Sequence, residues 1–135
     1  MVDQDLLVGW EHPPQPVAAG RAAVRYFERS GDRVALDYAQ GTLGRALVGF
    51  GRHDQAVELL EQMLAREGGA HREMIEALFL LARRARGDVG VVLPKSLTNH
   101  PLTDDLRRLL RPSATATNIE RFVRSSAFDQ GVRTG

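Results

Sequence analysis

Residues 37–70 read DYAQGTLGRALVGFGRHDQAVELLEQMLAREGGA, and they hold two helical patterns separated by a glycine-containing turn. A small residue lies in each half: Gly44 in the first and Ala56 in the second. At these positions the backbones of paired helices can approach closely while larger side chains fill the space around them. Leucines recur on one face of each helix, at Leu43, Leu47, Leu60 and Leu64. The pattern predicts an antiparallel pair of packed helices.

The same kind of pattern continues on both sides of this stretch. Apolar spacing predicts helices over residues 17–30, 33–50 and 71–86, in addition to the helix that carries Ala56 and Leu64. Glycines separate the four segments, and Asp32 is placed to cap the second helix. Connections this short require consecutive helices to pack as antiparallel neighbours. The glycine breaks are Gly31, Gly51, Gly68-Gly69 and Gly87.

An internal period of 34 residues relates these helices. Ala22 and Ala56 lie 34 positions apart, as do Tyr26 and Leu60. The same step carries a set in the second helix onto the fourth: Gln40, Leu43, Gly44 and Leu47 correspond to Met74, Ala77, Leu78 and Leu81. A fixed period of this length indicates a helical repeat.

Residues 37–70 resemble the tetratricopeptide-repeat (TPR) family, through Leu43-Gly44, the turn at Gly51–Asp54, and Ala56. The stretch from Gly31 through Leu64 is also similar to repeats in the sensor regions of large actinobacterial transcription regulators. The resemblance covers roughly residues 17–92. It implies an all-α fold in which antiparallel helical hairpins stack as a short TPR-like right-handed solenoid. The sequence departs from the family pattern at Gln40, Gly68 and Leu78.

In the family, the first helix of each pair lines a concave groove that binds a peptide or a helix. The resemblance therefore implies partner-binding residues on two helices: Tyr38, Thr42 and Arg45, with Gly49, on the second, and Arg72, Glu76, Phe79 and Arg83, with Ile75, on the fourth. Phe79 lies off the main apolar face of its helix, which suits an anchor site rimmed by charge. The alternative is that Phe79 packs against the C-terminal segment. The arginines suit an acidic partner.

The chain divides into an N-terminal arm (1–16), the repeat region (17–92) and a C-terminal segment (93–135). We expect Leu6, Leu7 and Trp10 to pack the arm. In the last segment, residues 94–101 are expected to form a loop and Thr103–Asp105 to cap a short helix that ends before Pro112. A flexible connector follows at residues 113–117, then a helix from Asn118 that carries Ile119, Phe122, Val123 and Phe128. Residues 131–135 are expected to be disordered. The C-terminal helices either cap the repeat stack or form a peptide that binds elsewhere.

Composition excludes several classes of function. Apolar residues make up 43% and charged residues 26% of the 135, and the net charge is +1, which gives no global field to attract nucleic acid or an anionic membrane. Cysteine is absent, so thiolate catalysis and zinc sites built on sulfur are excluded. The acidic start, Met1–Asp5, is unlike a signal peptide, and no apolar run has membrane-spanning length. We therefore expect a cytoplasmic location.

The side chains that could catalyse a reaction, bind a metal or bind nucleic acid each have a structural interpretation. The four histidines, His12, His53, His71 and His100, do not have metal-ligand spacing, and no serine has a nucleophile setting. Glu73 and Glu76 begin their helix and Arg83, Arg84 and Arg86 end it, which complements the helix dipole. Without an aromatic stacking platform, the arginines do not predict nucleic-acid binding. We expect no catalysis, no cofactor and no metal.

The sequence favours a non-catalytic module that binds a peptide or helix of a partner protein. One alternative is a detached or truncated fragment of a TPR-containing transcriptional regulator. Another is a structural subunit that self-associates.

Overall fold

The computed structural model describes residues 13–66 and 71–134, which form seven α-helices and one short 3₁₀-helix, with no strand in these two ranges. The all-α fold class is confirmed. The helices are α2 (Gln15–Ser30), α3 (Arg33–Gly49), α4 (His53–Ala65), α5 (Arg72–Arg86), η1 (Lys95–Leu97), α6 (Thr103–Leu109), α7 (Ala116–Val123) and α8 (Ser126–Thr134).

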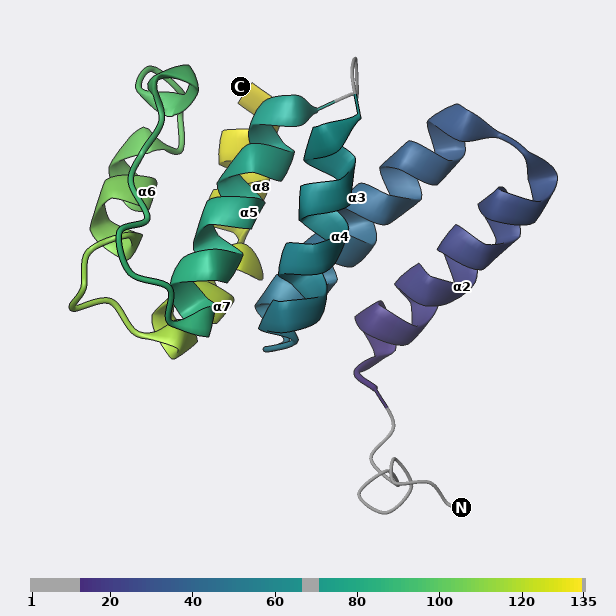
Figure 1. The fold of residues 1–135 in the computed structure, drawn as a ribbon, viewed down its shortest axis with the longest axis horizontal. Coiled ribbons are helices and arrows are strands. Elements are labelled where there is room, and N and C mark those ends of the chain that lie inside the picture. The colour runs from purple at the N-terminus through teal and green to yellow at the C-terminus, as the bar shows by residue number, and fades with distance from the viewer. Residues whose placement is uncertain (1–12, 67–70, 135) are drawn as a thin grey trace.

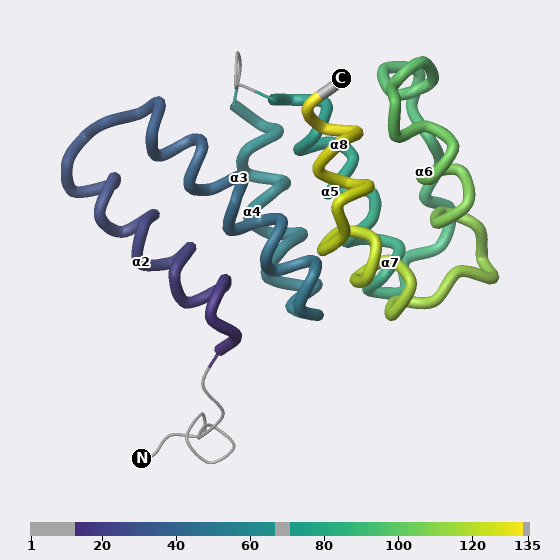
Figure 2. Tube along the Cα trace, turned by 180° about the vertical axis from the view of Figure 1, so that it is seen from behind, coloured from purple at the N-terminus to yellow at the C-terminus, as the bar shows by residue number. Residues whose placement is uncertain are grey.

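The first four helices follow one another across the molecule in chain order (Figure 1). Helix α3 packs against α2, α4 and α5, and α4 packs against α5. Beyond α5 lies α6, and the chain then turns back so that α7 contacts both α3 and α5. From behind, α8 lies in front of α5 (Figure 2). The C-terminal segment therefore covers one side of the α3–α5 pair.

The expected breaks between α2 and α3 and after α5 are confirmed. Gly31 and Gly87 take left-handed backbone, with φ of +77° and +106°, which glycine adopts without steric cost. The Asp32 carboxylate accepts a hydrogen bond from the Ala35 amide at 3.0 Å and so caps α3. Helix α2 begins at Gln15 and not after Pro16, because proline is tolerated in the first turn of a helix. Leu6, Leu7, Trp10, Gly68 and Gly69 lie outside the described residues.

Small residues lie where helices approach, as the sequence predicts. A Cβ at Gly44 would lie 2.8 Å from Cδ2 of Leu60, and Ala56 is fully buried. A glycine in α2 serves the neighbouring crossing, because a Cβ at Gly20 would lie 3.0 Å from Cδ1 of Leu43. These contacts set the close packing of α2, α3 and α4.

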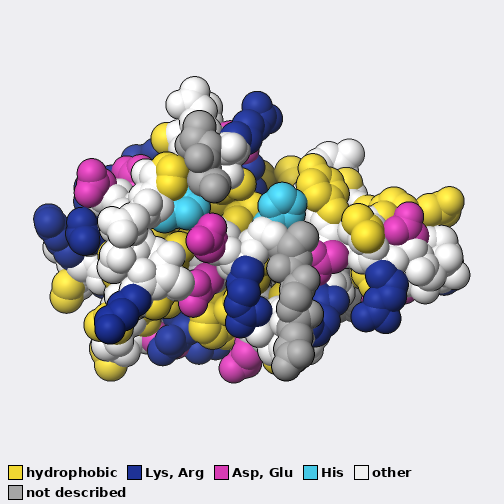
Figure 3. Space-filling model, turned by 90° about the horizontal axis from the view of Figure 1, so that it is seen from above, with side chains coloured by type: hydrophobic (Ala, Val, Ile, Leu, Met, Phe, Trp, Pro, Cys, Tyr) yellow, Lys and Arg dark blue, Asp and Glu magenta, His cyan; other side chains and the backbone are white. Residues whose placement is uncertain are grey.

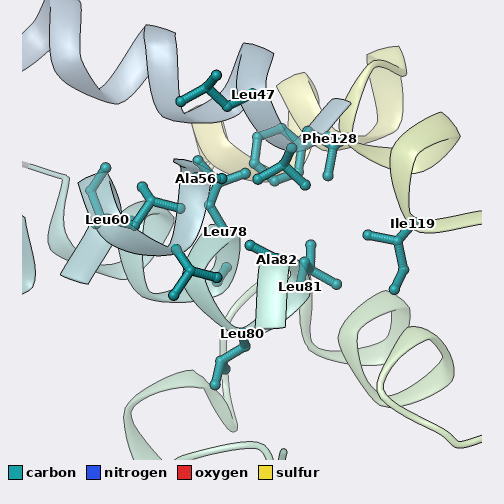
Figure 4. Packing of buried hydrophobic residues seen from close by; sticks show 14 of the residues in the cluster. Leu47, Ala56, Leu60, Leu78, Leu80, Leu81, Ala82, Ile119 and Phe128 are labelled. Carbon is teal, nitrogen blue, oxygen red and sulfur yellow. The ribbon is translucent and has the colours of Figure 1, made fainter. Parts of the chain in front are cut away.

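The hydrophobic core extends from the first helices into the C-terminal ones. Leu47 of α3, Ala56 of α4 and Leu78 of α5 point into the same interior as Phe128 of α8 (Figure 4). Ile119 of α7 is fully buried in the same cluster. Because α7 and α8 contribute large buried side chains, the C-terminal segment is part of the fold's single core.

Two expectations for the C-terminal segment are wrong, and a third is shifted. Residues 113–115 lie between α6 and α7, where a connector is predicted, but Thr115 and Asn118 form a capping box and α7 begins at Ala116, two residues earlier than expected. The single predicted helix from Asn118 is two helices, α7 and α8, joined at residues 124–125. Residues 131–134, expected to be disordered, belong to α8, and Gly131 is buried.

The start of α6 also differs from expectation. Its N-cap is Leu102, with no side-chain capping bond, and Thr103 is the first helical residue. The buried Thr103 hydroxyl instead bonds the preceding loop: it lies 2.5 Å from the carbonyl oxygen of Leu97 and 2.9 Å from the amide of His100. The Thr103 side chain therefore orders the turn that leads into α6.

Candidate partner-binding pocket

The outer face of α3 carries exposed apolar side chains. Val34 and Tyr38, one helical turn apart, are 83% and 69% exposed, and Thr42 follows one turn later. Arg45 lies next along this face and is half-buried beneath the C-terminal helices. Seen from above, hydrophobic side chains gather at the surface over the end formed by α2 and α3 (Figure 3). This face is open at its N-terminal half and covered at its C-terminal half.

A cavity of about 310 Å³ lies where α3, the start of α5 and α8 meet. Apolar side chains from all three elements line it, with charged groups among them. Helix α3 supplies Asp37, Tyr38, Gly41, Thr42 and Arg45; the α5 side supplies His71, Met74 and Ile75; and α8 supplies Phe128, Asp129, Val132 and Arg133. A space this size, mainly apolar with a few polar groups, can hold one or two side chains of a partner.

Arg45 joins α3 to the C-terminal helices. Its Nε donates to the carbonyl oxygen of Val123 at 2.8 Å, and its Nη2 to that of Ser125 at 3.3 Å. Its Nη1 bonds the Asp129 carboxylate, and this hydrogen bond lowers the pKa of Asp129. The guanidinium also lies 4.7 Å from the ring centroid of Phe128. All three guanidinium nitrogens of Arg45 therefore bond groups within the chain in this structure.

A second cavity, of about 440 Å³, also has Arg45 in its lining. It is lined by Pro16 of α2, by Thr42, Arg45, Ala46 and Phe50, and by Val123 and Arg124. The Arg124 guanidinium lies 5.3 Å from the Phe50 ring centroid and donates to the Gly49 carbonyl oxygen at 2.7 Å. Thr42 and Arg45 line both cavities, so the two hollows flank one turn of α3.

The structure brings together four of the nine predicted partner-binding residues. Tyr38, Thr42 and Arg45 line the 310 Å³ cavity, together with Ile75. Arg72, Glu76, Phe79 and Arg83 are not among its lining residues.

Those four side chains face other parts of the chain. Arg72 donates to the Leu64 carbonyl oxygen at 3.0 Å, at the end of α4. Glu76 accepts a hydrogen bond from Ser96 Oγ at 2.7 Å.

Arg83 turns toward the segment that follows α5, and its guanidinium lies over the Phe79 ring. Phe79 is half-buried, packs against the core and has the Arg83 guanidinium 5.7 Å from its ring centroid. Arg83 Nε donates to Asp88 at 3.1 Å. Arg83 and Glu76 thus bond residues 88 and 96, and the alternative packing of Phe79 against the C-terminal segment stays a prediction.

Sequence reasoning missed the side chains that α8 contributes. Phe128 and Val132 are four residues apart, which places them on one helix face, but the nearby Gly131 and the position near the end of the chain obscured that pattern. His71 was also missed as a pocket residue. It has left-handed backbone (φ +55°) at the N-cap of α5, a conformation that few non-glycine residues adopt.

Other polar groups connect elements that lie far apart in the chain. His53 Nε2 lies 2.7 Å from Glu120 Oε2 and joins the α3–α4 turn to α7, while its Nδ1 is buried without a hydrogen-bond partner. Within residues 13–66 and 71–134 no three His, Asp or Glu side chains cluster as a metal site would require. None of the helices in those ranges has the length and apolar character that crossing a membrane demands.

Comparisons with family models, with curated proteins and with solved structures find no match to this chain.

Proposed function

We propose that this chain is a non-catalytic protein-interaction module of the TPR-like kind, which binds a peptide or helix of a partner protein along α3. The 34-residue period, the close approach of Gly44 to Leu60 and the side-by-side order of α2 to α5 support a TPR-like right-handed solenoid. In that arrangement α3 and α5 line one face, and the 310 Å³ cavity lies between them.

One observation carries the proposal: an exposed aromatic side chain stands at the edge of an apolar cavity. Tyr38 is 69% exposed and lines the cavity, while Met74 and Ile75 form part of its apolar lining. Aromatic residues beside a desolvated pocket are the usual centres of binding energy in protein interfaces. A partner side chain that enters the cavity would cover Tyr38 and lose its own contact with water.

We expect a partner segment that is less acidic than the one predicted from the arginines of the sequence. Arg45, Arg72 and Arg83 each bond groups within this chain, so they are not free cations in the groove. The cavity lining includes the exposed Arg133 and His71 but also two carboxylates. A partner segment with one large apolar side chain and mixed charge fits this lining.

The test is selection of binders from a displayed library of short peptides against the full chain. We expect the selected peptides to lose at least tenfold in affinity for Tyr38→Ala, which is the usual loss at an interface centre. Tyr26→Ala is the matched control, because Tyr26 is a 61% exposed aromatic on α2, outside both cavities. Peptides that bind Tyr38→Ala as well as they bind the wild type would remove α3 as the site.

A second candidate, self-association, is favoured by the outer face of α2. Only Val17 and Gly20 of its sixteen residues are buried. Ala19, Ala22 and Tyr26 are exposed on one face, where a further helix could pack. Light scattering over a range of concentrations tests this candidate: a dimer that Ala22→Glu dissociates would support it, and a monomer throughout would contradict it.

A further inference from the structure

Helix α8 occupies the covered half of the α3 face in the manner of a bound helix. Its Asp129 carboxylate pairs with Arg45, and its Phe128 ring is fully buried beside the same guanidinium. The next turn contributes Val132 to the cavity wall. An aromatic residue, the carboxylate that follows it and an apolar residue one turn later are thus the groups that this face recognises.

Helix α8 buries Phe128 and Gly131 against the rest of the fold, but its covalent link to that fold is short. It has nine residues and follows α7 after a two-residue junction, Arg124-Ser125. Ser126, Ala127, Gln130 and Arg133 are exposed, so one side of the helix faces solvent. The 310 Å³ cavity beside it shows that α8 does not fill the space between α3 and α5.

Three features of Arg45 make this site suited to exchange. The guanidinium keeps two hydrogen bonds to carbonyl oxygens at the α7–α8 junction, so its orientation is fixed independently of Asp129. Its planar fork presents several N–H donors in a fixed geometry that matches a carboxylate. Its remaining N–H groups can therefore donate to a carboxylate of either α8 or another helix.

We propose that α8 is an exchangeable internal ligand, and that the partner is an amphipathic helix that presents an aromatic residue followed directly by a carboxylate and displaces α8 from Arg45. The inference rests on the proposed function, since it names the partner chemistry of the same face. In the free chain α8 competes with the partner. Only chains in which α8 is undocked can bind the partner, so the apparent affinity for the partner equals the intrinsic affinity multiplied by the undocked fraction.

The experiment measures binding of a fluorescein-labelled peptide of residues 124–135 to the full-length chain by anisotropy. Asp129→Asn in the protein weakens the internal competitor, while the peptide keeps its aspartate. We expect this variant to bind the peptide about tenfold more tightly than the wild type, as the loss of one charged hydrogen bond predicts. The matched control is Asp104→Asn, which removes a fully exposed carboxylate on α6 that pairs with Arg107 and should leave the affinity unchanged.

Two further binding measurements test which groups of the peptide and of the protein are needed for recognition. A peptide with alanine in place of Phe128 should lose binding, and so should the double variant Arg45→Met/Asp129→Asn with the wild-type peptide. Circular dichroism of each variant confirms that it is folded. Equal affinity of the wild type and Asp129→Asn, or peptide binding that ignores Arg45, would overturn the proposal. A dimer of Asp129→Asn in light scattering would also overturn it, because the occupant would then be α8 of a second copy.

A reporter on α8 tests displacement directly. The chain has no cysteine, so Ala127→Cys on the exposed side of α8 can carry a single environment-sensitive dye. Addition of a Tyr38-dependent library peptide should change its emission, whereas the same dye at Ala19→Cys on α2 should not respond. If Tyr38-dependent peptides bind without a response at residue 127, α8 stays in place and this inference fails while the proposed function stands. If no library peptide depends on Tyr38, the proposed function fails first.

Discussion

The guanidinium of Arg45 lies 4.7 Å from the ring centroid of Phe128, which joins the middle of α3 to the last described helix. The same group bonds Asp129 and two carbonyl oxygens at the α7–α8 junction. Arg45→Lys keeps the charge but not the planar fork that reaches several acceptors. We expect the free energy of unfolding to fall by about 1–2 kcal/mol, measured by urea denaturation. Arg121→Lys, at an exposed site on α7, should change it little.

Gly131 marks the closest approach of α8 to the loop before α6. A Cβ at this position would lie 2.1 Å from Cδ2 of Leu102, which is itself buried. We expect Gly131→Ala to lower the free energy of unfolding by about 1–3 kcal/mol through overpacking. Gly41→Ala is the matched change, because a Cβ there would be 3.5 Å from its nearest neighbours in Met74 and Ile75. That variant should be neutral or stabilised by up to about 1 kcal/mol.

The capping box of Thr115 and Asn118 determines where α7 begins. The Thr115 hydroxyl accepts the Asn118 amide at 3.1 Å. Thr115→Ala should therefore cost about 1 kcal/mol and speed hydrogen exchange in the first turn of α7. Thr117→Ala, within the same turn but outside the cap, is the control. Equal exchange rates in the two variants would contradict a role for the cap.

The lowered pKa of Asp88 predicts that the folded chain loses stability in acid. Hydrogen bonds from Arg86 and then from Arg83 lower its pKa from 3.8 to about 2. Because the pKa is lower in the folded chain than in the unfolded one, this contribution is present above the ordinary value of 3.8 and is lost as the pH falls toward about 2. Urea denaturation across this window should show a shallower pH slope for Asp88→Asn. Asp104→Asn should keep the wild-type slope, and an unchanged slope in Asp88→Asn would contradict the assignment.

The first four helices could be predicted because local signals agreed with the fold. Gly31 and Asp32 mark the α2–α3 boundary through backbone freedom and a capping carboxylate, both of which are short-range effects. Gly44 and Ala56 follow from a period that is visible in the sequence itself. Such features can be read from local spacing or from the repeat period, so no knowledge of distant contacts was needed.

The C-terminal segment could not be predicted to the same degree because its structure depends on distant contacts. Gly131 discourages a helix locally, yet here a glycine is what allows α8 to approach Leu102. Phe128 becomes a core residue through contacts that include Arg45, 83 positions earlier in the chain. The same limit applies to the site: positions carried from the family placed Arg83 and Glu76 in a groove, whereas Asp88 and Ser96 bind them elsewhere.

Because α3, α4 and α5 all precede α8 in the chain, they leave the ribosome before the helix that covers Arg45 has been synthesised. During that interval the arginine and the apolar surface beside it have no internal occupant. A helix from another newly made protein would then bind beside Arg45 without having to displace α8. Capture of a partner during translation would accordingly be faster than capture by the finished chain.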